Sequence, residues 1–424
     1  MERKIYSDLL KWKKDINRKP LLIYGNKQVG KTFSVLSFGE TEYKTVAYLN
    51  SDNHPVLIDM MKNERTIDKI ITKLSLLVGE TILKNDTLIV IDNVTDENVV
   101  KAIKKFGKEE NDYHIIMITS HKEKLTIFKG EELNYRVMSS MDFEEYLMAV
   151  GNLELIDFIK TSFKNNEPMP FHNIAMDHYE DFLMTGGLPE VVLAFLNKES
   201  DLKVKVIQNK VLDCYKKEFL NMPNLIDMVR ANEVLNVLPY QLLKPNKKFQ
   251  YGLMRSGSRS KDYESAIDYL TNNGFIYKSY KISKVKPPLS NCRDVESFKL
   301  YLNDTGLLFM MMHLSRIRLF SDFNLKYILY ENSVASTIVG CGYSLYYFQS
   351  EGKAEVPFIV QSRAGEIIAV EIVNKNIAKA KSLSLFMSRF DCKEAIRITE
   401  ENFSVKDKIK YVPIYALFCL NEIL

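Results

Sequence analysis

The chain has 424 residues, of which 46% are hydrophobic and 26% charged, and its formal net charge is +4 at pH 7. This composition excludes a disordered or low-complexity protein, and the length predicts roughly three domains. No apolar stretch approaches the roughly 18 to 20 residues of a membrane span, and the N-terminus is charged, so we expect a cytoplasmic protein without a membrane partner. The mildly basic charge by itself neither requires nor excludes nucleic acid.

Residues 1–141 are predicted to form an α/β domain. Short apolar runs alternate there with longer, helix-like stretches. The runs are Leu21–Tyr24, Val46–Leu49, Leu88–Ile91 and Ile115–Ile118. Unbroken runs rich in β-branched residues are typical of strands that are buried on both faces of a parallel sheet.

The rest of the chain is predicted to form three further segments. Residues 142–222 follow a helical pattern and suggest a helical lid. Residues 223–290 combine short helices with an alternating strand at 274–282, as in a small winged-helix unit. Residues 291–424 mix helices with strand-like runs and predict a mixed α/β domain.

The segment after the first apolar run fits the P-loop pattern G-x-x-x-x-G-K-[ST], and it leads into a helix-compatible stretch. In such a loop the backbone N–H groups surround phosphates, the lysine contacts the β- and γ-phosphates, and the threonine coordinates Mg²⁺. We therefore predict that this segment binds ATP and Mg²⁺. The predicted nucleotide-binding residues are Gly25, Asn26, Lys27, Gln28, Val29, Gly30, Lys31, Thr32 and Phe33.

The third apolar run ends in Asp92, which is predicted to hold Mg²⁺ together with Thr32, as a Walker B aspartate does. The next residue is Asn93, where AAA-type enzymes have a glutamate that activates the attacking water. An amide cannot accept a proton, and loss of a positioned base slows a reaction by about 10²- to 10⁴-fold. Asp96 and Glu97 are nearby carboxylates that could replace it, although their spacing directs them elsewhere. No catalytic residue is assigned.

Two polar residues, Thr119 and Ser120, end the fourth apolar run. A side chain at this position can contact the γ-phosphate, or it can cap the strand. The sequence leaves both roles open.

Several motifs occur in one order along the chain: the loop at 24–32, Phe143–Tyr146, Gly186–Pro189, Leu238–Leu242 and Tyr301–Leu308. With these motifs the chain resembles a widespread prokaryotic family of AAA-type ATP-binding proteins that have a C-terminal region of unknown function. The resemblance covers nearly the whole length. It implies that the last domain has a restriction-endonuclease-like core.

The resemblance also implies which residues active members would use to hold a divalent metal: an aspartate and the glutamate of an E-x-K triplet. Here Pro357 stands at the aspartate position, and the triplet reads Glu371-Ile372-Val373. Glu331 and Glu371 remain, but the metal lacks a ligand and the attacking hydroxide lacks the lysine. We expect this domain to be inactive as a nuclease.

A second departure concerns an arginine that relatives place directly after a glycine and that could reach a neighbour's γ-phosphate. In this chain Gly130 is followed by Glu131, so Arg136 could act in its place only if the loop shifts. An arginine finger contributes about 10³- to 10⁵-fold to turnover. Its loss again favours binding over hydrolysis.

Basic residues cluster between positions 244 and 261. They are Lys244, Lys247, Lys248, Arg255, Arg259 and Lys261. In a winged-helix unit they could face the phosphates of DNA, with an affinity that falls as salt rises. A solvated surface is the alternative.

The sequence therefore predicts an ATP- and Mg²⁺-binding AAA-type protein that acts as a nucleotide-dependent switch with weak or no hydrolysis, in possible association with DNA. A slow ATPase stimulated by DNA or by a partner is the main alternative, and an ATP-gated nuclease is a third. A homo-oligomer is compatible with the sequence, which does not fix the oligomeric state.

Overall fold

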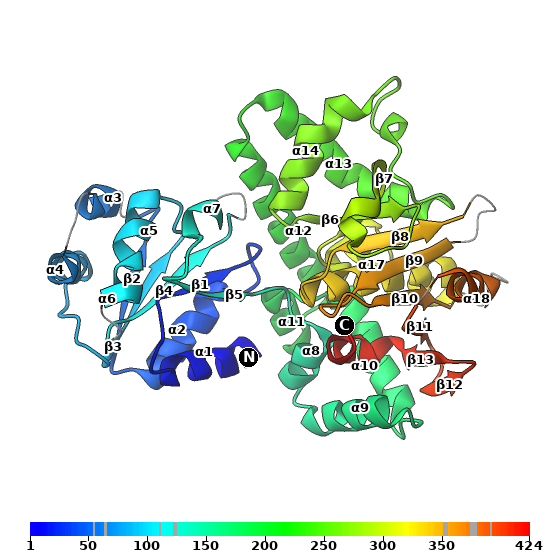
Figure 1. The fold of residues 1–424 in the computed structure, drawn as a ribbon, viewed down its shortest axis with the longest axis horizontal. Coiled ribbons are helices and arrows are strands. Elements are labelled where there is room, and N and C mark those ends of the chain that lie inside the picture. The colour runs from blue at the N-terminus through cyan, green and yellow to red at the C-terminus, as the bar shows by residue number, and fades with distance from the viewer. Residues whose placement is uncertain are drawn as a thin grey trace. The chain divides into compact units, whose positions relative to one another are not determined.

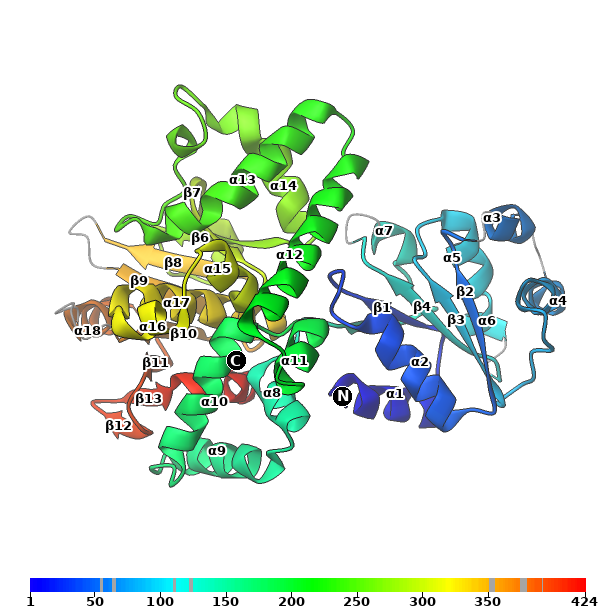
Figure 2. The ribbon, with the colours of Figure 1, turned by 180° about the vertical axis from the view of Figure 1, so that it is seen from behind.

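A computed structural model of the chain describes residues 1–53, 56–62, 66–109, 112–121, 125–350, 355–373, 380–390 and 392–424. The chain divides into two compact units, shown in Figure 1 and from behind in Figure 2. Unit 1 comprises Met1–Ser140 with Asn272–Gly274, and unit 2 comprises Met141–Thr271 with Phe275–Leu424. In the described part of the chain, no helix is both long and apolar enough to cross a membrane.

Unit 1 is built on a five-stranded sheet in the order β2-β3-β4-β1-β5, in which all neighbouring strands are parallel. The strands are β1 (Leu21–Tyr24), β2 (Thr45–Asn50), β3 (Thr87–Asp92), β4 (His114–Thr119) and β5 (Asn134–Val137). Every residue of β3 and β4 is buried, as expected for strands that are covered on both faces. The predicted α/β architecture is confirmed, and its four predicted strands are β1 to β4.

Helices cover both faces of this sheet (Figure 1). The helices of unit 1 are α1 (Ile5–Lys14), α2 (Lys31–Glu42), α3 (Val56–Met61), α4 (Ile67–Val78), α5 (Glu97–Lys104), α6 (Phe106–Glu109) and α7 (Leu125–Phe128). One apolar cluster joins α1 and α2 to Leu21 and Ile23, and another joins α3, α4 and α5 to Leu22. Alternate residues of one strand thus point to opposite layers.

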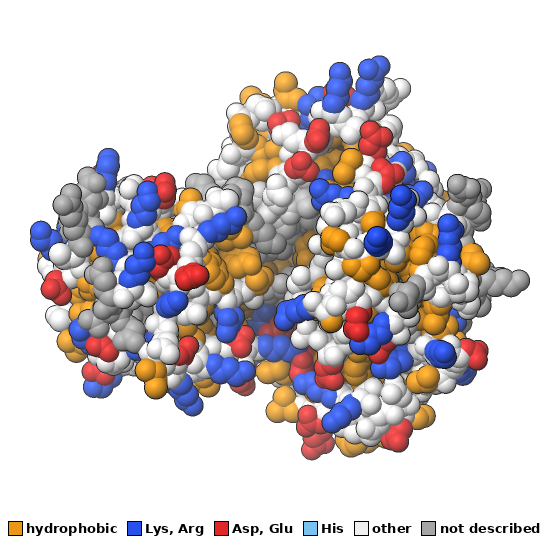
Figure 3. Space-filling model, in the orientation of Figure 1, with side chains coloured by type: hydrophobic (Ala, Val, Ile, Leu, Met, Phe, Trp, Pro, Cys, Tyr) orange, Lys and Arg blue, Asp and Glu red, His pale blue; other side chains and the backbone are white. Residues whose placement is uncertain are grey.

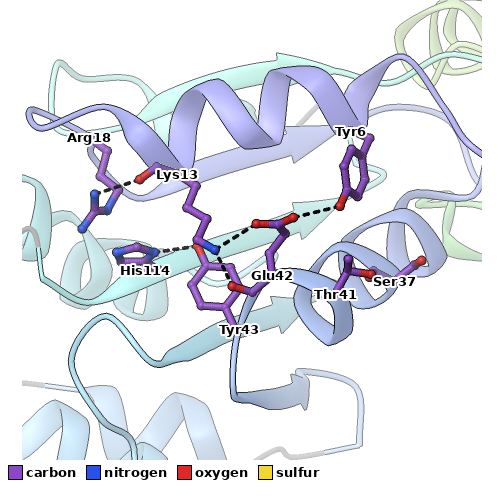
Figure 4. A network of polar contacts seen from close by, with 8 residues as sticks. All are labelled: Tyr6, Lys13, Arg18, Ser37, Thr41, Glu42, Tyr43 and His114. Atoms are coloured by element: carbon purple, nitrogen blue, oxygen red, sulfur yellow. Dashed lines mark hydrogen bonds and ion pairs between the residues drawn. The ribbon is translucent and has the colours of Figure 1, made fainter.

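A polar network joins α1 to the end of α2 and to β4 (Figure 4). The Lys13 ammonium donates to the Glu42 carboxylate at 3.0 Å and to the Glu42 carbonyl oxygen, and the Tyr6 hydroxyl donates to the same carboxylate at 3.1 Å. The Tyr43 hydroxyl lies 2.5 Å from Nδ1 of His114. Burial lowers the pKa of His114 to about 4, so its ring is neutral at pH 7. This network holds α1 beside α2.

Unit 2 combines helices with an eight-stranded mixed sheet. Its helices are α8 (Phe143–Val150), α9 (Leu153–Asn165), α10 (His172–Thr185), α11 (Pro189–Leu196), α12 (Asp201–Glu218), α13 (Leu225–Leu243), α14 (Ser260–Asn272), α15 (Thr305–Met311), α16 (Arg316–Ser321), α17 (Phe323–Gly340) and α18 (Ala380–Arg389). Its strands are β6 (Ile276–Ile282), β7 (Arg293–Leu302), β8 (Leu345–Gln349), β9 (Glu355–Gln361), β10 (Ile367–Ile372), β11 (Glu394–Thr399), β12 (Ser404–Lys406) and β13 (Ile409–Pro413).

The sheet of unit 2 has the order β12-β13-β11-β10-β9-β8-β6-β7. The strands β8, β9 and β10 are successively antiparallel, and β11 joins β10 in parallel. The strand predicted at 274–282 is β6, which pairs with β7 and β8 in this sheet. One apolar cluster, from Met141 to Leu424, includes residues of all three segments that were predicted after residue 141.

Asp304 links two of the sequence motifs inside unit 2. Its carboxylate caps α15 by accepting from the backbone N–H of Leu307 at 3.0 Å, and it accepts from the N–H of Gly187 at 2.8 Å. The two backbones are so close that a Cβ at Gly306 would lie 2.3 Å from the carbonyl oxygen of Thr185. Only a glycine fits at position 306 without a backbone shift.

We expect Gly306→Ala to destabilise unit 2 by about 1–3 kcal/mol, because the added methyl group overpacks a backbone contact. Urea unfolding followed by far-UV circular dichroism measures the change. Gly340→Ala in α17 is the control, since its added Cβ would have no atom within 4 Å apart from its chain neighbours and the backbone of its own helix. It should be neutral or stabilising by up to about 1 kcal/mol. Equal effects of the two substitutions would contradict the steric argument.

Candidate functional site

The predicted phosphate-binding loop leaves β1 at Tyr24 and enters α2 at Lys31. Gly30 precedes the helix with a left-handed backbone (φ 88°), which glycine adopts at least cost. Gly25 is required by a close approach, because a Cβ there would lie 1.9 Å from the carbonyl oxygen of Met138. The loop therefore leads to the N-terminus of a 12-residue helix, whose free N–H groups and dipole attract anions.

The predicted nucleotide-binding residues follow this loop and the first turn of α2. Gly25, Asn26, Val29 and Lys31 are buried, Lys27, Gly30 and Thr32 are half-buried, and Gln28 and Phe33 are exposed. The buried members shape the loop, and the exposed ones are accessible to a ligand.

The Lys31 ammonium lies against the loop. It donates to the carbonyl oxygens of Gly25 at 2.9 Å and Asn26 at 2.7 Å, and to the Ser120 hydroxyl at 2.8 Å. These three acceptors are uncharged. Of the two polar residues that end β4, Ser120 therefore faces the loop, whereas the Thr119 hydroxyl accepts from a backbone N–H two residues later, as in a strand cap.

Thr32 and Asp92, the predicted metal ligands, lie in direct contact. The Thr32 hydroxyl donates to Oδ2 of Asp92 at 2.6 Å, and the Tyr48 hydroxyl donates to the same oxygen at 3.1 Å. Burial and the neighbouring Asp92 charge raise the pKa of Tyr48, which keeps its hydroxyl a donor. Hydroxyl and carboxylate oxygens are the ligands that Mg²⁺ prefers. Tyr48 carries no motif, so sequence analysis missed it.

The side chain of Asn93 points to the end of β2. Its amide donates to Oδ2 of Asp52 at 3.1 Å and to Oδ1 of Asn50 at 3.4 Å. Its backbone is left-handed (φ 55°), a conformation that asparagine tolerates better than most residues. Sequence analysis missed both Asn50 and Asp52, because only the pairing of β2 with β3 brings them to this position.

The two carboxylates that sequence analysis considered as replacements for the missing base are engaged on α5. Asp96 caps this helix by accepting from the N–H groups of Asn98 and Val99. Glu97 forms an exposed ion pair with Lys101 one turn along the helix, at 2.8 Å. Both carboxylates therefore make contacts within α5.

Arg136, considered as a displaced arginine finger, lies on β5 at the edge of the sheet. Its guanidinium donates to the carbonyl oxygen of Tyr135 at 2.8 Å and lies 3.7 Å from the Asp8 carboxylate of α1. These contacts hold it within unit 1.

A pocket of about 230 Å³ lies between the N-terminal segment and the first turns of α2. Its lining residues are Met1, Glu2, Arg3, Ile5, Tyr6, Phe33, Ser34 and Ser37. Arg3 fixes the segment by donating to the carbonyl oxygens of Val29 at 2.8 Å and Ser139 at 2.9 Å. The pocket thus adjoins the predicted phosphate site through Phe33.

Glu331, one of the two glutamates predicted to remain from a nuclease site, is buried in a charged cluster on α17. Lys247 forms an ion pair with it, the Lys299 ammonium lies at 3.8 Å, and the Tyr301 hydroxyl donates to it at 2.6 Å. Lys299 also pairs with Glu355 at 2.5 Å. Burial alone would raise the pKa of Glu331, but the two lysine charges outweigh it and lower that pKa to about 2.

Glu371, the other remaining glutamate, forms a buried pair with Arg397 of the neighbouring strand at 2.7 Å. Both glutamates are therefore neutralised by cations of the protein itself. Among the described residues, no three His, Cys, Asp or Glu side chains are grouped so that they could hold a metal.

The basic cluster at 244–261 is only partly available for a ligand. Lys247 is directed inward to Glu331, the Lys248 ammonium donates to the Ser297 hydroxyl, and Arg255 pairs with Glu233. Figure 3 shows acidic side chains among the basic ones over α13 and α14 at the top of unit 2. Lys247 takes neither of the two roles that the sequence left open for this cluster, DNA contact or a solvated surface, because its charge compensates a buried carboxylate.

Two family models match separate parts of the chain. Residues 17–147 match one described as an AAA domain, and residues 176–318 match one described as a domain of unknown function. Unit 1 therefore carries an AAA-type domain, a class of nucleotide-binding domain, as its parallel sheet and loop predicted. A comparison with curated protein sequences found no match.

Three solved structures are similar to the chain at low sequence identity. The ORC1 protein of Aeropyrum pernix in complex with DNA is 11% identical (TM-score 0.29; 73% of this chain and 91% of that chain covered). Drosophila ORC bound to DNA is 11% identical, with a TM-score of 0.28, and the match covers 73% of this chain and 95% of that chain. A DNA polymerase III gamma subunit-related protein of Thermotoga maritima is 10% identical, with a TM-score of 0.23, and the match covers 78% of this chain and 99% of that chain. At these values none of the three defines the function of this chain.

We expect Glu331→Gln to destabilise unit 2 by about 3–5 kcal/mol, because it leaves the charges of the half-buried Lys247 and the buried Lys299 undercompensated. Unfolding followed by far-UV circular dichroism measures the loss, while the fluorescence of Trp12, the single tryptophan, reports unit 1. Glu296→Gln, on an exposed carboxylate of β7, is the matched control and should change stability by less than about 0.5 kcal/mol. A similarly small effect of Glu331→Gln would show that the charged cluster contributes little to the stability of unit 2.

Proposed function

We propose that the chain is a nucleotide-dependent switch, in which unit 1 binds ATP with Mg²⁺ and so changes the conformations that the whole chain populates. The observation that carries this proposal is the meeting of Lys31, Thr32 and Asp92 at the N-terminus of α2. The match of residues 17–147 to an AAA domain supports it.

The groups at this site fit a triphosphate and a divalent cation. The Lys31 ammonium lies at the loop, where it donates to the carbonyl oxygens of Gly25 and Asn26 and to the Ser120 hydroxyl, and a phosphate bound there would offer it a charged acceptor. Thr32 and Asp92 supply the hydroxyl and carboxylate oxygens for Mg²⁺. When bound, Mg²⁺ supplies positive charge against the phosphate oxygens.

The pocket beside Phe33 is the proposed site of the nucleotide base. It adjoins the first turn of α2, and its lining combines the rings of Tyr6 and Phe33 with the aliphatic Ile5. Aromatic and aliphatic surface suits the flat, weakly polar faces of a purine.

Binding without rapid hydrolysis is favoured by the residues around Asp92. Asn93 cannot accept a proton, and the carboxylates of Asp96 and Glu97 are engaged on α5. A bound ATP would therefore persist long enough to shift a conformational equilibrium, which requires differential affinity and no hydrolysis.

For unit 2 we propose a restriction-endonuclease-like core without nuclease activity. The order α17, antiparallel β8-β9-β10, α18 and parallel β11 supports such a core. The ion pairs of Glu331 and Glu371 do not favour an ATP-gated nuclease.

The helices α13 and α14 with the β6-β7 hairpin support the proposed winged-helix element. The exposed Lys244, Arg259 and Lys261 could still contact DNA.

We expect ATP with Mg²⁺ to raise the unfolding free energy of unit 1 by about 2.7 kcal/mol at a hundredfold excess over its Kd. Trp12 fluorescence during urea unfolding measures the gain. Lys31→Ala should abolish it, whereas Lys44→Ala, on an exposed lysine at the opposite end of β2, should preserve it. Absence of any gain in the unaltered protein would disprove the proposed function.

A further inference from the structure

We propose that Asp52 is the base of a slow ATP hydrolysis at this site, in the role that Asn93 cannot fill. The inference rests on the proposed binding of ATP and adds to it a means by which the bound state ends. Asp52 would accept a proton from the attacking water, and Asn93 would act as a positioning residue that holds the carboxylate.

Strand pairing brings Asp52 to the site. In the parallel register of β2 and β3, Asn50 pairs with Asp92, and the N–H of Ser51 donates to the carbonyl oxygen of Asp92 at 2.9 Å. The chain then turns, with the N–H of Asp52 donating to the Asn50 side chain at 3.0 Å. Asp52 thus lies two residues after the end of β2, the strand that pairs with β3 and its predicted metal ligand Asp92.

A continuous set of hydrogen bonds connects the Asp52 carboxylate to the phosphate-binding loop. Asp52 accepts from the Asn93 amide at 3.1 Å, and the N–H of Asn93 donates to Oδ1 of Asp92 at 2.8 Å. Oδ2 of Asp92 accepts from Thr32, the last residue of the P-loop motif. These contacts place the Asp52 carboxylate one side chain away from the predicted metal ligand, and a general base acts on the attacking water either directly or through one further water.

Asp52 is also free of the contacts that occupy the other carboxylates nearby. Asp96 caps α5, and Glu97 pairs with Lys101. Within the part of the chain that the structure describes, no ion pair involves Asp52, and its side chain is exposed to water. It therefore keeps lone pairs for a proton.

The chemical step is a simple hydrolysis. The water oxygen forms a bond to the γ-phosphorus while the bond from that phosphorus to the bridging oxygen breaks, and its electron pair leaves with ADP. One proton of the water passes to the Asp52 carboxylate, which later releases it to solvent. The products are ADP, inorganic phosphate and a proton.

The geometry also accounts for a slow reaction. The hydrogen bond from the Asn93 amide engages one of the two carboxylate oxygens of Asp52. The carboxylate must also compete with bulk water for the attacking molecule. The site is suited to a long-lived ATP state that ends by occasional turnover.

The test combines two measurements on the full chain: the Kd for ATP with Mg²⁺ by calorimetry, and phosphate release from bound ATP in a single turnover. We expect Asp52→Asn to lower the release rate by about 10²-fold and to leave the Kd within about twofold. Asp52→Glu, which keeps a carboxylate, should recover part of the rate. Glu97→Gln is the matched control, and it should change neither quantity.

The outcomes separate the inference from the function on which it rests. If the unaltered protein binds no ATP, both fail. If it binds ATP but releases phosphate no faster than Lys31→Ala, the switch stands and the role of Asp52 is refuted. An unchanged release rate in Asp52→Asn, with ATP binding intact, also refutes it.

Discussion

The parallel pairing of the strands in unit 1 is the constraint on which the candidate site depends. Parallel strands end at the same edge of a sheet, so residues far apart in the sequence meet there. For this reason four parts of the chain meet at one edge: the predicted phosphate-binding loop after β1, Asn50 at the end of β2, Asp92 at the end of β3 and Ser120 after β4. A register shift of one residue in any pair would turn these side chains to the other face of the sheet.

The parts of the site that a motif defines could be predicted from the sequence, and the parts that strand pairing defines could not. The P-loop and Asp92 can be recognised from local spacing and composition, because phosphate binding requires N–H groups, glycines and a lysine in a fixed order. Tyr48 and Asp52 have no such pattern. The contact of Tyr48 with Asp92 and that of Asp52 with Asn93 form only because β2 lies beside β3, and Tyr48 stands 44 positions before the carboxylate that it contacts.

The same limit applied to charges in unit 2. A cluster of lysines and arginines at 244–261 could face DNA or solvent on sequence grounds, but Lys247 compensates Glu331 from 84 residues away. The fold class of unit 1 was predictable because unbroken apolar runs indicate doubly covered strands. The packing of the segments after residue 141 around one apolar cluster was harder to predict. Hydrophobic periodicity identifies helices and strands, but it does not tell which of them pack together.

The left-handed backbone of Asn93 restricts how this site can change in evolution. A glutamate at that position would restore a carboxylate next to Asp92 but would carry a backbone cost of about 1–2 kcal/mol, and only glycine, asparagine and aspartate adopt the conformation readily. It would also place a second negative charge beside Asp52. Of the two acidic residues, aspartate is therefore the one that this turn accepts at the lower backbone cost, whereas glutamate requires the backbone after β3 to change as well.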